Sequence, residues 1–123
     1  MQVLIVEDDL IISLVLDRMV HQLGHEVLEK VTTGENAIKI ARQNQPDLIL
    51  MDIRLAGDLD GIETMMEIHK ENQIPVIYIT GNNDNRNRLR AEETNFIDFL
   101  IKPISIEELE QCMVDAAKPQ TRG

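Results

Sequence analysis

The stretch Leu48-Ile49-Leu50-Met51-Asp52 places an acid directly after four apolar residues. Unbroken apolar runs of this length are typical of strands that are buried on both faces of a parallel sheet. Three other runs also end in polar side chains: residues 3–6 precede Glu7 and Asp8, residues 76–79 precede Thr80, and residues 96–101 precede Lys102. Because parallel strands end at the same edge of a sheet, we expect these side chains to share one pocket.

The side chains expected in this pocket are three carboxylates, a hydroxyl and an ammonium group. Carboxylates are preferred ligands of Mg²⁺, so Asp8 and Glu7 are the candidate ligands for Mg²⁺ or Mn²⁺. A carboxylate can also attack phosphorus and form an acyl phosphate, which makes Asp52 the candidate nucleophile. Lys102 is a compact charge that could contact a phosphoryl oxygen, and Thr80 offers a hydroxyl donor. The pattern indicates a protein that is phosphorylated on its own aspartate.

Strand-like and helix-like segments alternate five times along the chain. The predicted strands are residues 3–6, 26–31, 47–52, 76–79 and 96–101. The predicted helices are residues 10–23, 32–45, 61–69, 82–94 and 105–118. Five units of this length imply a parallel sheet that is covered by helices on both faces.

Local signals mark several helix ends. Thr32 with Glu35, and Ser105 with Glu108, match the capping-box pattern that opens a helix. Residues 82–94 are rich in Asn and Arg and offer few apolar anchors, so we expect a marginal helix there. Arg86, Arg88 and Arg90 in this segment form either a solvated face or a docking surface for an acidic partner.

Bulk properties set limits on the class of protein. We expect residues 1–118 of the 123 to form one domain and residues 119–123 to form a tail. The formal net charge of -10 argues against direct binding of nucleic acid or an anionic membrane, because phosphate neutralisation requires a surplus of cations. The single cysteine, Cys112, excludes an intramolecular disulfide and suits a reducing compartment, so a cytoplasmic protein is expected.

The chain resembles the receiver domains of two-component response regulators over essentially its whole length. The resemblance rests on Val6-Glu7-Asp8-Asp9, Met51-Asp52-Ile53, Asp60-Gly61, Thr80-Gly81 and Lys102-Pro103, which occur in this order. It implies a flavodoxin-like, doubly wound (βα)5 fold with the strand order 2-1-3-4-5. It also implies phosphoryl transfer to Asp52 from a histidine kinase or a histidine phosphotransfer protein.

The resemblance assigns further roles to residues around the pocket. The backbone carbonyl of Arg54 would be a metal ligand, and the Lys102–Pro103 peptide bond would be cis. Thr80 and Phe99 would form the switch, in which Thr80 moves toward the phosphoryl group and Phe99 turns inward. Gly81 would bind the phosphoryl group, and the side chains of Arg54 and Asn82 would tune the rate of dephosphorylation.

The resemblance also implies a signalling face made of the fourth helix, the fifth strand and the fifth helix. The partner at this face would be a downstream protein or a second copy of the chain. No reaction is expected beyond the protein's own phosphorylation and autodephosphorylation. The loop 53–61 departs from the family pattern, because Ala56-Gly57 replaces a usual proline and adds one residue.

Three alternative hypotheses about the function use the same residues. A phosphorylation-independent pseudo-receiver scaffold usually lacks one of the acids, the Thr or the Lys, and all are present here. A phosphatase resembling the haloacid dehalogenases would need a second acid two residues after Asp52, where Arg54 stands. A flavin-binding domain would need a phosphate-cradling loop and stacking aromatics, and the chain has one Tyr and no Trp.

Overall fold

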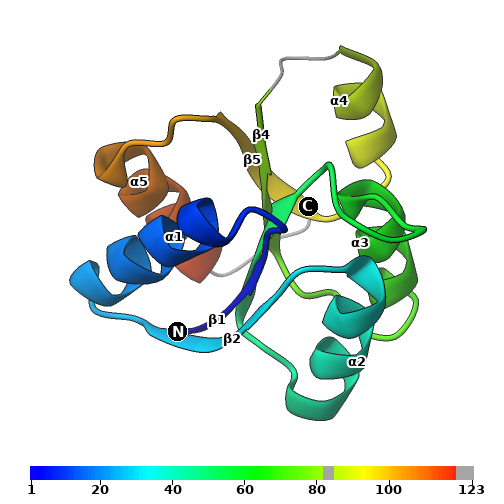
Figure 1. Cartoon of the computed structure of the whole chain (residues 1–123), viewed down its shortest axis with the longest axis horizontal. Helices are drawn as coiled ribbons and strands as arrows, with labels where there is room; N and C mark the ends of the chain where they lie inside the picture. Colours follow the sequence, from blue (N-terminus) through cyan, green and yellow to red (C-terminus); the bar gives the residue numbers. More distant parts are fainter. Residues whose placement is uncertain (82–84, 119–123) are drawn as a thin grey trace.

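The computed structural model describes residues 1–81 and 85–118, and it contains a five-stranded parallel sheet with the order β2-β1-β3-β4-β5 (Figure 1). The strands are β1 (Gln2–Val6), β2 (Glu26–Val31), β3 (Leu48–Asp52), β4 (Val76–Thr80) and β5 (Phe96–Ile101). The helices are α1 (Leu10–Gln22), α2 (Gly34–Asn44), α3 (Gly61–His69), α4 (Asn85–Ala91) and α5 (Ile106–Ala117). The predicted flavodoxin-like fold and its strand order are confirmed.

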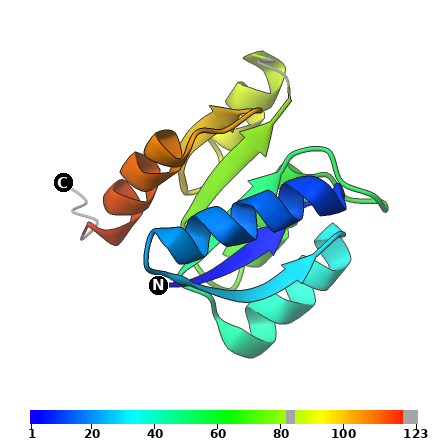
Figure 2. The same ribbon diagram turned by 60° about the vertical axis from the view of Figure 1, so that its left-hand side comes forward.

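The helices form two layers on opposite faces of the sheet. Helices α1 and α5 cover one face, and α2, α3 and α4 cover the other, as the two views show (Figures 1 and 2). Strand β3 lies in the middle of the sheet, and all five of its residues are buried. Its unbroken apolar sequence follows from this position, because residues on both faces of a central strand meet a helix layer.

The structure corrects several predicted element boundaries, mostly by one or two residues. Helix α2 is capped by Thr33 rather than Thr32, and the Thr33 hydroxyl accepts a hydrogen bond from the Asn36 backbone N–H at 3.2 Å. The capping box of Thr32 and Glu35 was therefore wrong. Thr33 is held in an extended conformation by a parallel bridge to Ala56, so the helix begins one residue later. Strand β3 begins at Leu48 rather than Asp47.

Other local predictions agree with the structure. Ser105 and Glu108 form the predicted capping box at the start of α5. Helix α4 lies inside the predicted range 82–94 but is shorter, at seven residues. The predicted tail at 119–123 lies outside the described residues. None of the helices in the described part of the chain is long and apolar enough to cross a membrane.

Cys112 lies on the buried face of α5, where it is 3% exposed and its thiol is 3.9 Å from Asp98 Oδ2. Burial, followed by the nearby charge of Asp98, raises the pKa of the thiol to about 11. Because the thiolate is the reactive form, we expect the folded protein to react with an aromatic disulfide reagent at neutral pH far more slowly than the unfolded protein. Rapid labelling of one thiol per chain without denaturant would show that Cys112 is accessible.

Candidate functional site

The polar residues that follow the strands do share one pocket at the carboxyl edge of the sheet. Asp52 ends β3, Thr80 ends β4, and Glu7 follows β1; their exposed fractions are 4%, 6% and 1%. A cavity of about 340 Å³ opens beside them and is lined by Asp8, Asp52, Arg54, Thr80, Gly81 and Lys102. The strand ends therefore bring together residues from four separate segments.

Lys102 bridges two of the acids. Its Nζ lies 2.9 Å from Glu7 Oε1 and 3.2 Å from Asp52 Oδ2. Partial burial acts to lower the pKa of Lys102, but the hydrogen bond to Glu7 and the charge of Asp52 outweigh it, and the pKa is raised overall. The ammonium therefore stays charged beside Asp52. The Lys102–Pro103 peptide bond is cis, as the resemblance implied.

Glu7 is the most deeply buried acid of the site. Its Oε2 accepts a hydrogen bond from the Asp9 backbone N–H at 3.1 Å, whereas its Oε1 receives no well-aligned hydrogen bond within the described residues. Burial, and then the neighbouring Asp52 carboxyl, raise the pKa of Glu7. Asp9 itself caps α1, since its Oδ1 accepts from the backbone N–H groups of Ile11 and Ile12.

The acids of the site fit a hard divalent cation. Glu7, Asp8 and Asp52 each present a carboxylate oxygen, and these atoms lie within 4.8 Å of one another. Mg²⁺ and Mn²⁺ match this donor set, because they bind a few carboxylates together with water and phosphate oxygens. The Arg54 backbone N–H donates to Asp52 Oδ1 at 3.3 Å, and the ligand role of its carbonyl stays a prediction.

We expect Mg²⁺ to raise the Tm of the metal-free protein, because a cation relieves the repulsion among the three carboxylates. A raised pKa means that protonated Glu7 stabilises the metal-free fold at acidic pH and that this contribution is lost as the pH rises through the pKa. The Mg²⁺-induced rise in Tm should therefore grow with pH in this range.

Asp8→Asn should weaken Mg²⁺ binding by about tenfold or more in calorimetric titration, since a ligand matters at least as much as an outer-shell partner. Asp58→Asn is the matched control, because Asp58 is exposed in the loop after β3 and lies outside the acid cluster. Equal Mg²⁺ affinities for the two variants would contradict the site.

The proposed switch residues lie on neighbouring strands. Phe99 of β5 is 7% exposed, and its ring stacks on Tyr78 with centroids 5.2 Å apart. The ring that was expected to turn inward is thus packed inward in this structure. An added Cβ at Gly81 would meet nothing within 4 Å among the described residues, which leaves open space on that side of the pocket. Asn82, the second predicted rate-tuning residue, lies outside the described residues.

The loop between β3 and α3 is anchored on α2, a contact that no sequence pattern indicated. Ala56 forms the bridge with Thr33, and Gly57 has a φ of 93° and lies against the Glu35 carboxylate. Asp60 caps α3 through a capping box with Glu63, and its Oδ2 also pairs with Arg90 Nη2 of α4 at 2.9 Å. The loop thus connects Asp52 to α2 and α4.

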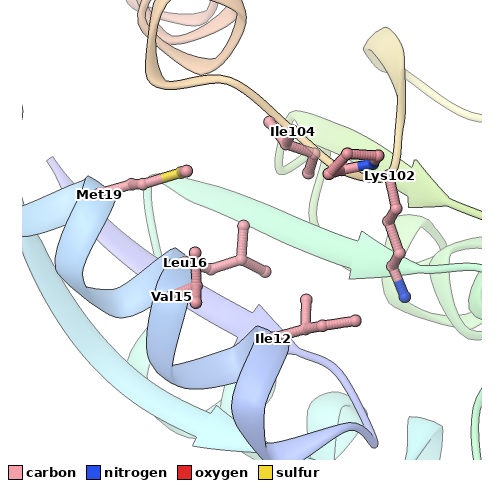
Figure 3. Close-up of a pocket in the computed structure, with 7 residues that line it drawn as sticks. Ile12, Val15, Leu16, Met19, Lys102 and Ile104 are labelled. Atoms are coloured by element: carbon pink, nitrogen blue, oxygen red, sulfur yellow. The ribbon is translucent and has the colours of Figure 1, made fainter.

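An apolar groove borders the site on the α1 side (Figure 3). It has a volume of about 350 Å³ and is lined by Ile12, Val15, Leu16, Met19, Lys102, Pro103 and Ile104. Lys102 belongs to both places, because it lines the groove and its ammonium pairs with Glu7 and Asp52. The sequence did not indicate this groove, since it depends on how α1 packs beside the loop after β5.

Comparison with known proteins gives matches over most of the chain. The response regulator receiver domain family matches residues 3–114. The transcriptional regulatory protein AfsQ1 of Streptomyces coelicolor is 34% identical over 101 residues, which cover 82% of this chain and 44% of that protein. The transcriptional regulatory protein PdtaR of Mycobacterium tuberculosis is 31% identical over 108 residues, which cover 88% and 52%. The chain therefore spans about half the length of these curated relatives.

Solved structures agree with this assignment. The signal receiver domain of a modulated diguanylate cyclase from Desulfovibrio desulfuricans has a TM-score of 0.87 and 35% identity, with 94% of this chain and 91% of that chain covered. The receiver domain of a sensor histidine kinase from Pseudomonas aeruginosa, solved with a magnesium ion in its active-site cleft, has a TM-score of 0.83 and 31% identity, with 95% and 98% covered. The shared fold, the matched residues and the acidic pocket agree, and the chain belongs to the response regulator receiver domain family.

Proposed function

We propose that this protein is a phosphorylation-activated signalling switch that accepts a phosphoryl group on Asp52 from a histidine kinase or a histidine phosphotransfer protein. The observation that carries the proposal is the position of the Asp52 carboxylate, which faces a cavity beside two further acids and 3.2 Å from the Lys102 ammonium. Family membership supports it, since receiver domains act in phosphorylation-dependent signalling.

The chain's own residues account for the main requirements of the transfer. An Asp52 carboxylate oxygen forms the new O–P bond as the N–P bond of the donor phosphohistidine breaks, and the imidazole leaves with that electron pair. Lys102 is placed to pair with a phosphoryl oxygen, and the Thr80 hydroxyl can donate to another. A cation held by Glu7, Asp8 and Asp52 would neutralise charge on the phosphoryl oxygens when bound.

The donor needs a surface beside this pocket, and we assign it to α1 and the adjoining groove. Leu10, Ile11, Leu14 and Val15 of α1 are 72%, 76%, 48% and 45% exposed, and the groove shares Lys102 with the site. Ile11→Ser should therefore slow transfer from a phosphorylated histidine phosphotransfer protein that labels the wild type. Its labelling by acetyl phosphate, which needs no docking surface, should not change; equal loss with both donors would contradict this surface.

The signal would leave through the face made of α4, β5 and α5, toward a downstream protein or a second copy of the chain. Leu89 of α4 is 65% exposed and Ile101 of β5 is 40% exposed, so this face carries apolar area for a partner. We expect a cytoplasmic protein that catalyses only its own phosphorylation and autodephosphorylation.

Intact-mass spectrometry after incubation with acetyl phosphate and Mg²⁺ tests the proposal. One added phosphoryl group per chain, lost when EDTA is present, is the expected result. No adduct, together with no spectral response of Tyr78 to beryllofluoride and Mg²⁺, would favour the pseudo-receiver scaffold. Continuous release of phosphate from phosphate monoesters would favour the phosphatase.

A further inference from the structure

The three aromatic residues of the chain form one cluster on the α4 side of the sheet. Tyr78 of β4 stacks on Phe99 of β5, with centroids 5.2 Å apart and planes at 30°. Phe96 packs edge-on against Phe99 at 5.2 Å and lies 6.3 Å from Tyr78. Tyr78 lies opposite Phe99 in the β4–β5 register, and Thr80, the other switch residue, is two positions further along β4. The cluster is therefore adjacent to the pocket.

Helix α4 closes this cluster from outside. The Arg88 guanidinium lies over the Phe99 ring, with Cζ 4.9 Å from the ring centroid. Below it, Thr94 Oγ1 donates to the Ala91 carbonyl at 2.6 Å and lies 2.9 Å from the Tyr78 hydroxyl. Because the Thr94 proton is used on Ala91, Tyr78 is the donor in that pair. The cluster is thus connected to two residues of α4: to Arg88 through the Phe99 ring, and to Ala91 through the hydroxyl groups of Tyr78 and Thr94.

We propose that Arg88 is a positioning residue that holds Phe99 in its buried rotamer and so prepares the pocket to receive a phosphoryl group. The inference rests on the proposed function, in which Phe99 is the switch aromatic. A guanidinium over a ring face gains favourable electrostatic and stacking contact, and this contact exists only while Phe99 stays inward. An outward Phe99 would leave the position beneath Arg88 and would also lose its stacking on Tyr78.

The size of the effect follows from the exposure of Arg88, which lies on the surface of α4. A cation–π contact at an exposed site changes an equilibrium by about two- to fivefold. If a ligand binds only the inward state, its apparent affinity falls in proportion to the population of that state. Removal of the guanidinium should therefore weaken binding of a phosphoryl mimic by up to about fivefold.

The composition of the chain supplies a clean probe. Tyr78 is the single Tyr and there is no Trp, so near-ultraviolet circular dichroism reports chiefly on the ring that stacks on Phe99. There are only two Phe residues, so protein labelled with ¹³C-Phe gives two ring signals. Wild type, Arg88→Met, Arg88→Lys and the control Arg42→Met would be compared. Arg42 pairs with Glu71 on the surface of α2–α3, away from the cluster.

Arg88→Met should reduce the Tyr78 dichroism, shift one Phe signal, and weaken the affinity for beryllofluoride with Mg²⁺ by up to about fivefold. Arg88→Lys, which keeps the cation, should fall between Arg88→Met and the wild type, and Arg42→Met should match the wild type.

Unchanged spectra and affinity in Arg88→Met would overturn the proposal, as would a lower free energy of unfolding with neither of the other two readouts moved. If the wild type gains no adduct from acetyl phosphate and gives no spectral response to beryllofluoride with Mg²⁺, the proposed function fails. The spectra of Arg88→Met then still show whether Arg88 holds Phe99.

Discussion

Asp52→Asn should abolish the phosphoryl adduct that acetyl phosphate and Mg²⁺ are expected to produce on the wild-type protein. An amide of nearly the same size replaces the carboxylate, so the nucleophilic oxygen is lost while the packing at the end of β3 is kept. Lys102 keeps its ion pair with Glu7 at 2.9 Å, so the substitution leaves no isolated charge in the pocket. The measurement is intact mass over a time course, with circular dichroism to confirm that the variant is folded.

Glu7 is the main alternative acceptor for the phosphoryl group, since it is the other buried carboxylate within reach of Lys102. Asp58→Asn, with its exposed carboxylate, should acquire the adduct at the wild-type rate. If Asp52→Asn still gained a phosphoryl group, peptide mapping would identify the acceptor. An acceptor at Glu7 or Asp8 would mean that the pocket is correct and the assigned nucleophile is wrong.

The sequence was sufficient for the fold because the three central strands, β1, β3 and β4, are buried almost throughout, and each was predicted to within one residue. The bounds of the more exposed edge strands β2 and β5 were predicted to the residue. An apolar run in a central strand cannot be replaced by a polar one without burying unpaired groups, so its ends are sharply marked. The same sharp ends located the site, because a polar residue directly after such a run lies at the sheet edge.

The buried face of α1 could not be read from its sequence. Leu10 and Ile11 at its start are largely exposed, whereas Leu16 and Val20 are buried against the sheet. Apolar residues occur on most sides of this helix, so a helical period does not select one face. Only the packing of α1 beside the sheet and the loop after β5 decides which residues are covered and leaves the groove next to Lys102.

Contacts between distant segments could not be predicted from the sequence either. The ion pair of Asp60 with Arg90 and the contact of Arg88 with Phe99 join α4 to the site, but neither pair has a local spacing that predicts it. The start of α2 shows the same limit on a smaller scale. Thr32 and Thr33 are both acceptable caps, and the bridge from Thr33 to Ala56 of a remote loop selects the second.

Gly61→Ala should cause the largest loss of stability among these substitutions. Gly61 opens α3 directly against the end of β3: its backbone N–H donates to the Ile53 carbonyl at 2.7 Å. An added Cβ would overlap the backbone carbonyl oxygen of Asp52 and approach Met51 Cγ to 2.8 Å. Since backbone cannot turn aside as a side chain can, α3 must move away from β3, at a cost of about 3 kcal/mol.

The displacement should also slow phosphorylation, because a shift of about 1 Å at a reacting group can reduce a rate by about a hundredfold. Urea unfolding and the acetyl phosphate time course measure the two effects. Gly81→Ala is the control for stability, since its Cβ would meet nothing within 4 Å among the described residues, and its free energy of unfolding should stay the same or rise by up to about 1 kcal/mol. If Gly61→Ala were as stable as Gly81→Ala, α3 would not pack on the Asp52 backbone, and the contact inferred between Asp52 and α3 would be wrong.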